Sequence, residues 1–131
     1  MKEIWTTIAG YEGHYDVSNY GRIKSLYRMR VGISGKPVSV KERILKPAST
    51  QKGYMFVGLS KNGVVNQFYV HRIVWESFVG TIDSDMEINH KDTDKKNNRL
   101  DNIECVTHQK NMLHAIENGL VTIMSPGKST G

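Results

Sequence analysis

Aromatic and β-branched residues near the start of the chain come in short runs that glycine and asparagine interrupt. Residues 3–26 show this pattern, which is typical of short strands and tight turns and leaves no room for a long helix. Between Arg28 and Ser39 the apolar content falls while glycine, serine and proline gather. This second stretch predicts a mobile, basic connection.

A hairpin signal follows in the middle of the chain. Residues 54–60 and 64–70 are rich in apolar residues and flank Lys61-Asn62-Gly63. Asparagine and glycine tolerate the positive φ that tight hairpin turns require. We therefore expect two antiparallel strands here.

The segment after this hairpin has the spacing of a short amphipathic helix. Its apolar positions recur at helical intervals, and Gly80 can end it in a left-handed cap. The residues expected on the apolar face are His71, Val74, Trp75 and Phe78.

The last third of the chain predicts a strand, a loop, a strand and a helix. Residues 86–89 and 103–106 are extended runs on either side of a polar loop, so they predict a second hairpin. Thr107 can cap a helix that continues to about Asn118. The residues expected on its buried face are Met112, Leu113 and Ile116.

These elements predict an α+β fold, in which a small N-terminal β-rich module and a hairpin pack against a ββα unit. The module covers residues 1–60, the second region covers 61–119 with its ββα core at 86–118, and residues 120–131 are expected to be a disordered tail. A chain of 131 residues fits one compact domain, or two small modules that share a core.

Composition narrows the choice of partner and metal. Lys and Arg outnumber Asp and Glu by 18 to 13 and the sequence pI is about 9.4, so a polyanionic partner is expected. Cys105 is the single cysteine, which excludes an internal disulfide and a four-cysteine zinc site. Any metal must be held by oxygen or histidine. No apolar run reaches the roughly 18 residues of a membrane span, and the start lacks the layout of a signal peptide, so a cytoplasmic protein is expected.

Basic residues concentrate between positions 20 and 61, where Glu42 is the only acidic residue. Such a stretch is either a footprint for phosphate groups or a solvated loop rich in lysine. Charge alone leaves both possibilities open. The basic residues are Arg22, Lys24, Arg28, Arg30, Lys36, Lys41, Arg43, Lys46, Lys52 and Lys61.

Three segments resemble one protein family in the order that the family has them. The stretch NHKDTDKKNNRLDNIECVTHQKN resembles the HNH, or ββα-metal, core of phage and intron-encoded homing endonucleases. The preceding VHRIVWESF resembles the helix before that core, and EIWTTIAGYEGHYDVSNYGRIKSL resembles the nuclease-associated N-terminal DNA-binding module. The resemblance implies a phage or bacterial DNA endonuclease and makes 61–119 the HNH nuclease region.

The resemblance also implies roles for individual residues. His90 would be the general base, and Asn89 and Asn111 would bind one Mg²⁺ ion, which Mn²⁺ or another divalent ion could replace. Many relatives have an aspartate in place of Asn89, so metal affinity without DNA should be low. A regular strand sends adjacent side chains to opposite faces, so we expect the strand to break between Asn89 and the loop that begins at Lys91.

Each of these residues also has a purely structural interpretation. His90 could be a polar turn residue, and Asn111 could be an exposed helix residue, although asparagine is a poor helix former. Asn102 is expected to fix the loop through hydrogen bonds to backbone groups. His71 is expected to be a core histidine or to support the site from behind.

The family resemblance favours the DNA interpretation of the basic residues. Further phosphate contacts are expected in the loop beside the site, and Arg72 is a weaker candidate because it can pair with Glu76 one turn on. The complete set of expected DNA contacts is Arg22, Lys24, Arg28, Arg30, Lys41, Arg43, Lys46, Arg72, Lys91, Lys95, Lys96 and Arg99.

The resulting hypothesis is an enzyme that nicks one strand of double-stranded DNA and needs no small-molecule cofactor. One alternative is a DNA-binding protein with weak or no catalysis, because Asn89 brings no charge to a metal site. A second alternative is a nuclease that acts on RNA. The sequence leaves the oligomeric state and the target site open.

Overall fold

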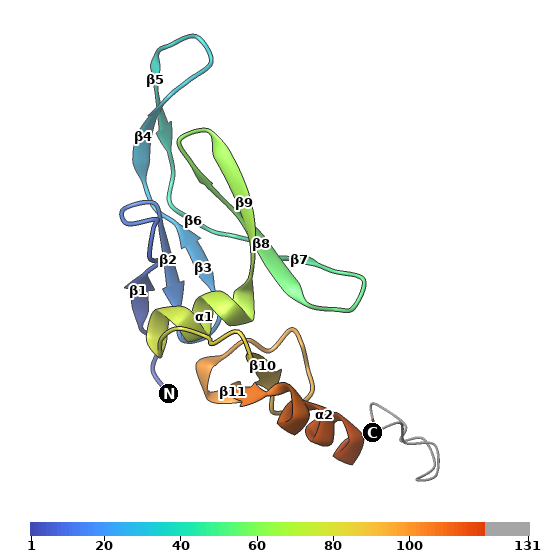
Figure 1. Cartoon of the computed structure of the whole chain (residues 1–131). Helices are drawn as coiled ribbons and strands as arrows, with labels where there is room; N and C mark the ends of the chain where they lie inside the picture. The colour runs from blue at the N-terminus through green and yellow to red at the C-terminus, as the bar shows by residue number, and fades with distance from the viewer. Residues whose placement is uncertain (120–131) are drawn as a thin grey trace.

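The N-terminal module is built on a small antiparallel sheet (Figure 1). The computed structural model describes residues 1–119. Four strands lie in the order β1-β2-β3-β6. Val17 and Ile23 pair across β2 and β3, and both are fully buried on the inner face. The strands are β1 (Trp5–Thr7), β2 (Tyr15–Ser18), β3 (Ile23–Ser25) and β6 (Arg43–Ile44).

The segment from 28 to 39, predicted to be a mobile connection, forms a β-hairpin. β4 (Arg28–Val31) pairs with β5 (Pro37–Val40), and the amide of Gly32 donates to the carbonyl of Lys36 at 2.8 Å in the turn. The prediction was wrong because it relied on low apolar content. This hairpin projects from the body of the protein and leaves most of its residues exposed, so it needs little apolar surface (Figure 1).

The hairpin predicted in the middle of the chain is confirmed. β8 (Met55–Lys61) pairs with β9 (Val64–Tyr69), and the short β7 (Ala48–Ser49) adds to the other edge of β8. Asn62 and Gly63 have φ values of 54° and 77°, as a tight turn of this kind requires.

Helix α1 (Val70–Phe78) follows β9 directly and covers the inner face of the sheets. His71 and Val74 are buried as predicted, whereas Trp75 and Phe78 are partly buried. The amide of Gly80 donates to the carbonyl of Trp75 at 3.1 Å and so closes the helix.

The strand, loop, strand and helix order of the last third is confirmed. β10 (Met86–His90) pairs with β11 (Ile103–Thr107), and a 3₁₀ turn, η1 (Leu100–Asn102), leads into β11. Helix α2 (His108–Glu117) begins at Thr107, whose hydroxyl accepts from the amide of Lys110 at 3.3 Å. Neither α1 nor α2, the α-helices of residues 1–119, is long and apolar enough to cross a membrane.

The predicted buried face of α2 is wrong for two of its three residues. Met112 and Leu113 are exposed by 40% and 52%, and Ile116 is partly buried. The helix rests on a sheet of only two strands and turns Asn111, His114 and Ala115 toward it, all of them partly buried. Periodicity locates an apolar stripe, but the narrow polar surface of this sheet selects a different side of the helix. The expected tail at 120–131 lies outside the described residues.

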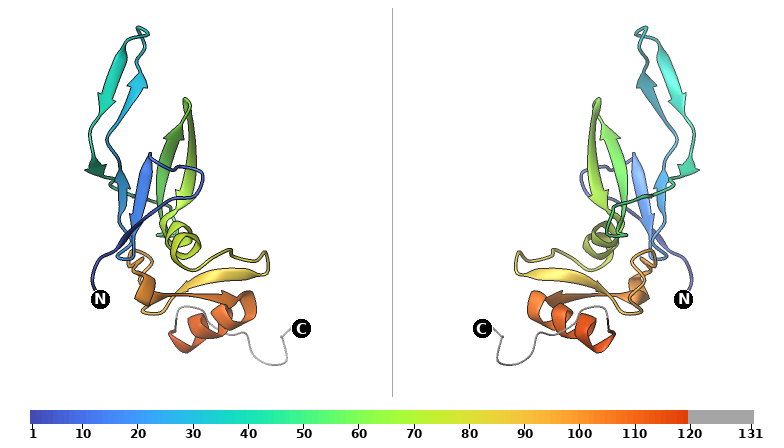
Figure 2. Two further views of the ribbon diagram at one scale, coloured as in Figure 1. Left: turned by 90° about the vertical axis from the view of Figure 1, so that its left-hand side faces the viewer. Right: turned by 90° about the vertical axis from the view of Figure 1, so that its right-hand side faces the viewer.

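The two-stranded sheet lies between the two helices (Figure 2), with α1 on one face and α2 on the other. Ile88 and Ile103 belong to the same buried cluster as Val17 and Ile23 of the N-terminal sheet and Val74 of α1. The N-terminal module and the last third of the chain therefore share one apolar core.

A close backbone contact also joins these two parts. A Cβ atom built on Gly21 would lie 2.8 Å from the carbonyl oxygen of Asn98 in the loop before β11. Nearby, the amide of Leu100 donates to the carbonyl of Asn19 at 2.9 Å. Gly21 has a φ of 86°, so both its conformation and its surroundings require glycine.

We expect Gly21→Ala to destabilise the protein more than Gly13→Ala. Gly13 has a φ of 78° but nothing within 4 Å of a built Cβ, so its substitution tests backbone conformation alone. The control should cost about 1–2 kcal/mol, and Gly21→Ala at least about 1 kcal/mol more, because the loop at Asn98 must move. Urea denaturation measures both values, and equal losses would contradict the close contact.

Candidate active site

Strand β10 pairs with β11 along one edge, and no strand of residues 1–119 pairs with its other edge. A hollow of about 300 Å³ lies along this open edge. We call it the edge hollow. Four consecutive residues of β10, 87–90, line it together with Asn111 of α2. Its wall is completed by Tyr54, Thr93, Lys95, His108, Met112, His114 and Ala115.

The position at a strand edge explains how neighbouring residues reach one space. Strand β10 stays regular through His90, so the expected break after Asn89 does not occur. Alternation therefore sends Asn89 toward the α2 side of the sheet and His90 toward the α1 side. Because the edge is open, side chains from both faces border the same hollow. The structure thus brings His90, Asn89 and Asn111 together.

A neighbouring asparagine orients the imidazole of His90. Its Nε2 lies 2.7 Å from Oδ1 of Asn98, and both residues are buried. An amide oxygen can only accept, so Nε2 must carry the hydrogen and donate it. Nδ1 is then the ring nitrogen that keeps a lone pair and can accept a proton.

Two carboxylates orient the side-chain amides. Nδ2 of Asn111 donates to Oε1 of Glu87 at 2.5 Å, and Nδ2 of Asn89 donates to Oε1 of Glu104 at 3.1 Å. Because carboxylates only accept, each amide must turn its nitrogen toward its carboxylate. The amide oxygens of Asn89 and Asn111 accept no hydrogen bond from residues 1–119 and are the atoms that a cation would prefer.

Asn102 binds the loop that joins the two strands. Its Oδ1 accepts from the amide of Asp92, and its Nδ2 donates to Oδ1 of Asp92 and to the carbonyl of Asn97. Hydrogen bonds from Asn97 above all, and also from Asp94 and Asn102, hold the pKa of Asp92 below its usual value. The side chain of Asn102 therefore fixes the loop conformation, as expected from its type.

The imidazole ring of His71 packs against that of His90. Their ring centroids are 5.3 Å apart in an edge arrangement, and the ring of His71 also stacks on that of Tyr69 at 5.3 Å. Nδ1 of His71 is buried and has no hydrogen-bond partner among the described residues. Burial, with smaller contributions from His90 and Arg72, lowers the pKa of His71 to about 4. His71 is therefore neutral at pH 7.

The basic residues divide into two groups. In the first, the charge is engaged within the protein: Arg28 donates to the carbonyls of His14 and Leu26 and to Ser25. Three others form ion pairs: Arg22 with Glu3, Arg72 with Glu76 and Arg99 with Asp101. Lys95 donates to the backbone carbonyl of Lys52. Cation–π contacts join Arg22 and Lys24 to Trp5, Lys95 to Tyr54 and Arg99 to Tyr20.

In the second group the side chain is exposed. These residues make no side-chain hydrogen bond or ion pair with residues 1–119, so their charge is available to a partner. They are Arg30, Lys41, Arg43, Lys46, Lys91 and Lys96.

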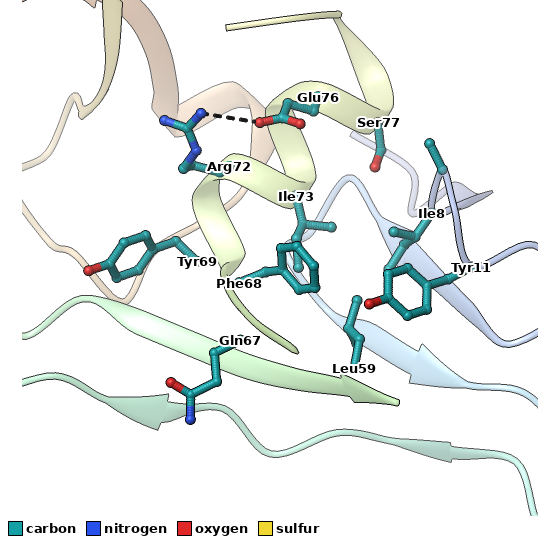
Figure 3. A pocket seen from close by; sticks show the side chains of 11 residues that line it. Ile8, Tyr11, Leu59, Gln67, Phe68, Tyr69, Arg72, Ile73, Glu76 and Ser77 are labelled. Carbon is teal, nitrogen blue, oxygen red and sulfur yellow. Dashed lines mark hydrogen bonds and ion pairs between the residues drawn. The ribbon is translucent and has the colours of Figure 1, made fainter. Parts of the chain in front are cut away.

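A second and larger hollow, of about 440 Å³, lies on the other side of α1 (Figure 3). Its wall is mostly apolar, with Ile8, Tyr11 and Phe68, and the Arg72–Glu76 ion pair stands above it. It contains none of the candidate residues for chemistry. We therefore place the candidate site at the smaller edge hollow.

No set of three His, Cys, Asp or Glu side chains in residues 1–119 is arranged to hold a metal ion. A cation in the edge hollow would therefore need amide oxygens, water or the substrate among its ligands. Sequence reasoning missed Glu87 and Asn98 as parts of this site. Strand alternation could have revealed Glu87, two positions before Asn89, whereas nothing in the sequence singles out Asn98 from its neighbour Asn97.

Comparison with known proteins identifies two regions of the chain. Residues 68–113 match the model of an HNH endonuclease family, and residues 3–60 match that of the NUMOD4 motif. The chain thus contains a NUMOD4 motif followed by a region that matches the HNH endonuclease family.

Two of the chain's relatives are described as homing endonucleases or putative homing endonucleases. The chain is 35% identical over 119 residues to the DNA endonuclease I-HmuI of Bacillus phage SP01, covering 91% of this chain and 61% of I-HmuI. It is 37% identical over 97 residues to YosQ, a putative HNH homing endonuclease of an SPbeta prophage in Bacillus subtilis (strain 168), covering 70% of this chain and 55% of YosQ. The chain thus spans little more than half of the relatives' length.

A solved structure described as DNA binding and cleavage by the HNH homing endonuclease I-HmuI has the same fold. The TM-score is 0.72 with 34% sequence identity, over 92% of this chain and 62% of the other. The α+β architecture is confirmed by this match.

We expect His71 to make folding sensitive to acid. A lowered pKa means that the folded state favours neutral imidazole, so its stability contribution is complete above about pH 6.5 and is lost as the pH falls toward 4. Between pH 7.5 and pH 5 the loss should be about 2 kcal/mol. Urea denaturation at both pH values should show a smaller loss for His71→Leu than for the unchanged protein, and equal losses would contradict a buried neutral His71.

Proposed function

We propose that the protein is a metal-dependent endonuclease that hydrolyses phosphodiester bonds of double-stranded DNA and cuts one strand per encounter. The observation that carries this proposal is the gathering of His90, Asn89 and Asn111 around one open hollow. The names of the relatives, which describe HNH and homing endonucleases, support the same activity.

A divalent ion such as Mg²⁺ fits the donor set of the edge hollow. The amide oxygens of Asn89 and Asn111 are turned away from the carboxylates that hold their nitrogens, and hard cations prefer oxygen ligands. When bound, the ion supplies a Lewis acid for the scissile phosphate and for the charge on the leaving oxygen. Mn²⁺ has the same ligand preference and could replace it.

His90 acts as the general base in this proposal. As the oxygen of a water molecule bonds to phosphorus, one proton of that water passes to Nδ1, and the bond from phosphorus to the 3′ oxygen of the leaving strand breaks. Asn98 holds the hydrogen on Nε2 and so keeps Nδ1 available. The neutral His71 behind the ring places no positive charge beside the base.

The exposed basic residues provide the contacts to the DNA backbone. Arg30 lies on the projecting β4–β5 hairpin, whereas Lys91 and Lys96 lie in the loop beside the edge hollow. Phosphate contacts at both places would position a duplex across the protein without reading its sequence. A single candidate site within residues 1–119 is consistent with cutting one strand.

We expect His90→Ala to lose at least about 100-fold in the rate of converting supercoiled plasmid to open circles with Mg²⁺ or Mn²⁺, as for loss of a general base. His14→Ala, in the N-terminal module, is the matched control and should cut like the unchanged protein. Equal cutting by His90→Ala would remove His90 from the mechanism.

The same assay separates the alternatives. No cutting by the unchanged protein with any divalent ion, together with retained DNA binding, would favour a binding protein. Asn89 gives this alternative its support, because an amide contributes no charge to a metal site. Faster cutting of a matched RNA duplex than of the DNA duplex would favour a ribonuclease.

We expect Arg30→Gln to weaken DNA binding and to reduce the slope of log affinity against log salt by about 1, because one phosphate contact and its counterions are lost. Arg28→Gln is the matched control on the same strand. Its charge is engaged within the protein, so it should leave the slope unchanged. Fluorescence anisotropy with labelled duplex DNA measures both slopes, and equal slopes for Arg30→Gln and the unchanged protein would contradict the contact.

A further inference from the structure

The proposed metal site lacks charge. Asn89 and Asn111 offer two neutral oxygens, whereas a divalent ion is normally bound through one or two carboxylates. The charge of a cation held by amides alone would be balanced only by the DNA.

One carboxylate stands beside these ligands. Glu87 and Asn89 are two positions apart on β10, so they lie on the same face of the sheet, toward α2. Glu87 lines the edge hollow and accepts the hydrogen bond of Asn111. It therefore contacts one candidate ligand and shares a strand face with the other.

We infer that Glu87 supplies the carboxylate ligand of the metal site, taking the place of the charge that residue 89 lacks. This inference rests on the proposed function for the identity of the site. A carboxylate has about four lone-pair positions. In the structure Glu87 uses one for Asn111 and one for Nδ1 of His108 at 3.3 Å, and its side chain is 37% exposed, so it can accept a cation as well.

Glu104 is the nearest competitor and does not fit as well. It pairs with Asn89 across the sheet and accepts its amide hydrogen at 3.1 Å. It lies on β11, however, away from the open edge of β10, and it is not part of the wall of the edge hollow. Glu104 thus orients Asn89, whereas Glu87 faces the space that a cation would occupy.

The test is direct binding of Mn²⁺ to the full chain without DNA, measured by the loss of the electron paramagnetic resonance signal of free Mn²⁺. Glu87→Gln should weaken binding at least about 10-fold, because the charged ligand is lost while the side chain keeps its size and an oxygen for Asn111. Glu42→Gln is the matched control, because Glu42 is an exposed carboxylate of the N-terminal module outside the wall of the edge hollow. It should bind Mn²⁺ within about 2-fold of the unchanged protein.

A rescue variant separates loss of charge from loss of structure. Adding Asn89→Asp to Glu87→Gln returns a carboxylate to the site from the neighbouring position on the same face, so binding should recover by at least about 10-fold. Unchanged Mn²⁺ binding by Glu87→Gln, or equal losses for Glu87→Gln and Glu42→Gln, would overturn the inference.

Plasmid cutting by the same variants distinguishes the two proposals. If Mn²⁺ binding depends on Glu87 but the unchanged protein does not cut, the metal site stands and the nuclease function fails. If the unchanged protein cuts and Glu87→Gln binds Mn²⁺ and cuts equally well, the function stands and the role of Glu87 fails.

Discussion

The open edge of β10 is the constraint on which the candidate site depends. Side chains alternate along a strand, so Asn89 and His90 belong to opposite faces of the sheet, one facing α2 and the other α1. They can serve one reaction only where both faces meet, which is at an edge without a neighbouring strand. A third strand beside β10 would separate the proposed base from the proposed metal ligands. The proposed site therefore depends on the small size of this sheet.

The N-terminal module contributes to the geometry of this site as well as to the fold. The backbone of Gly21 packs against the backbone of Asn98, and the side chain of Asn98 in turn holds Nε2 of His90. A substitution at Gly21, in the turn between β2 and β3, would therefore displace Asn98 and so alter the hydrogen bond that holds the imidazole of His90. The apolar core that the two parts share, which includes Val17 and Ile88, also holds them together. The two parts of the chain thus form one structural unit around the loop that precedes β11.

Electrostatics have two separate roles in the molecule. Some basic residues interact within the N-terminal module: Arg28 donates to a backbone carbonyl and Arg22 pairs with the carboxylate of Glu3. Others, such as Arg30 and Lys96, keep their charge exposed, and these are the ones that can contribute to binding of a polyanion. The total of 18 Lys and Arg residues includes both groups, so it overstates the number of residues whose charge is free to contact phosphate. Within the edge hollow the charge is mixed, since Glu87 provides a negative charge beside two neutral amides and Lys95 provides a positive one.

The sequence determined the features that depend on local chemistry. The Asn62-Gly63 turn, the helix that follows β9, the Thr107 cap and the order of the ββα unit were all predicted, because each depends on residues within a few positions of one another. Only the tertiary structure decided the rest. The β4–β5 hairpin forms with little apolar content, α2 turns Asn111 rather than Leu113 toward the sheet, and Asn98 rather than Asn97 reaches His90. These outcomes depend on which surfaces meet across the fold, and such contacts between distant residues leave no periodic signal in the chain.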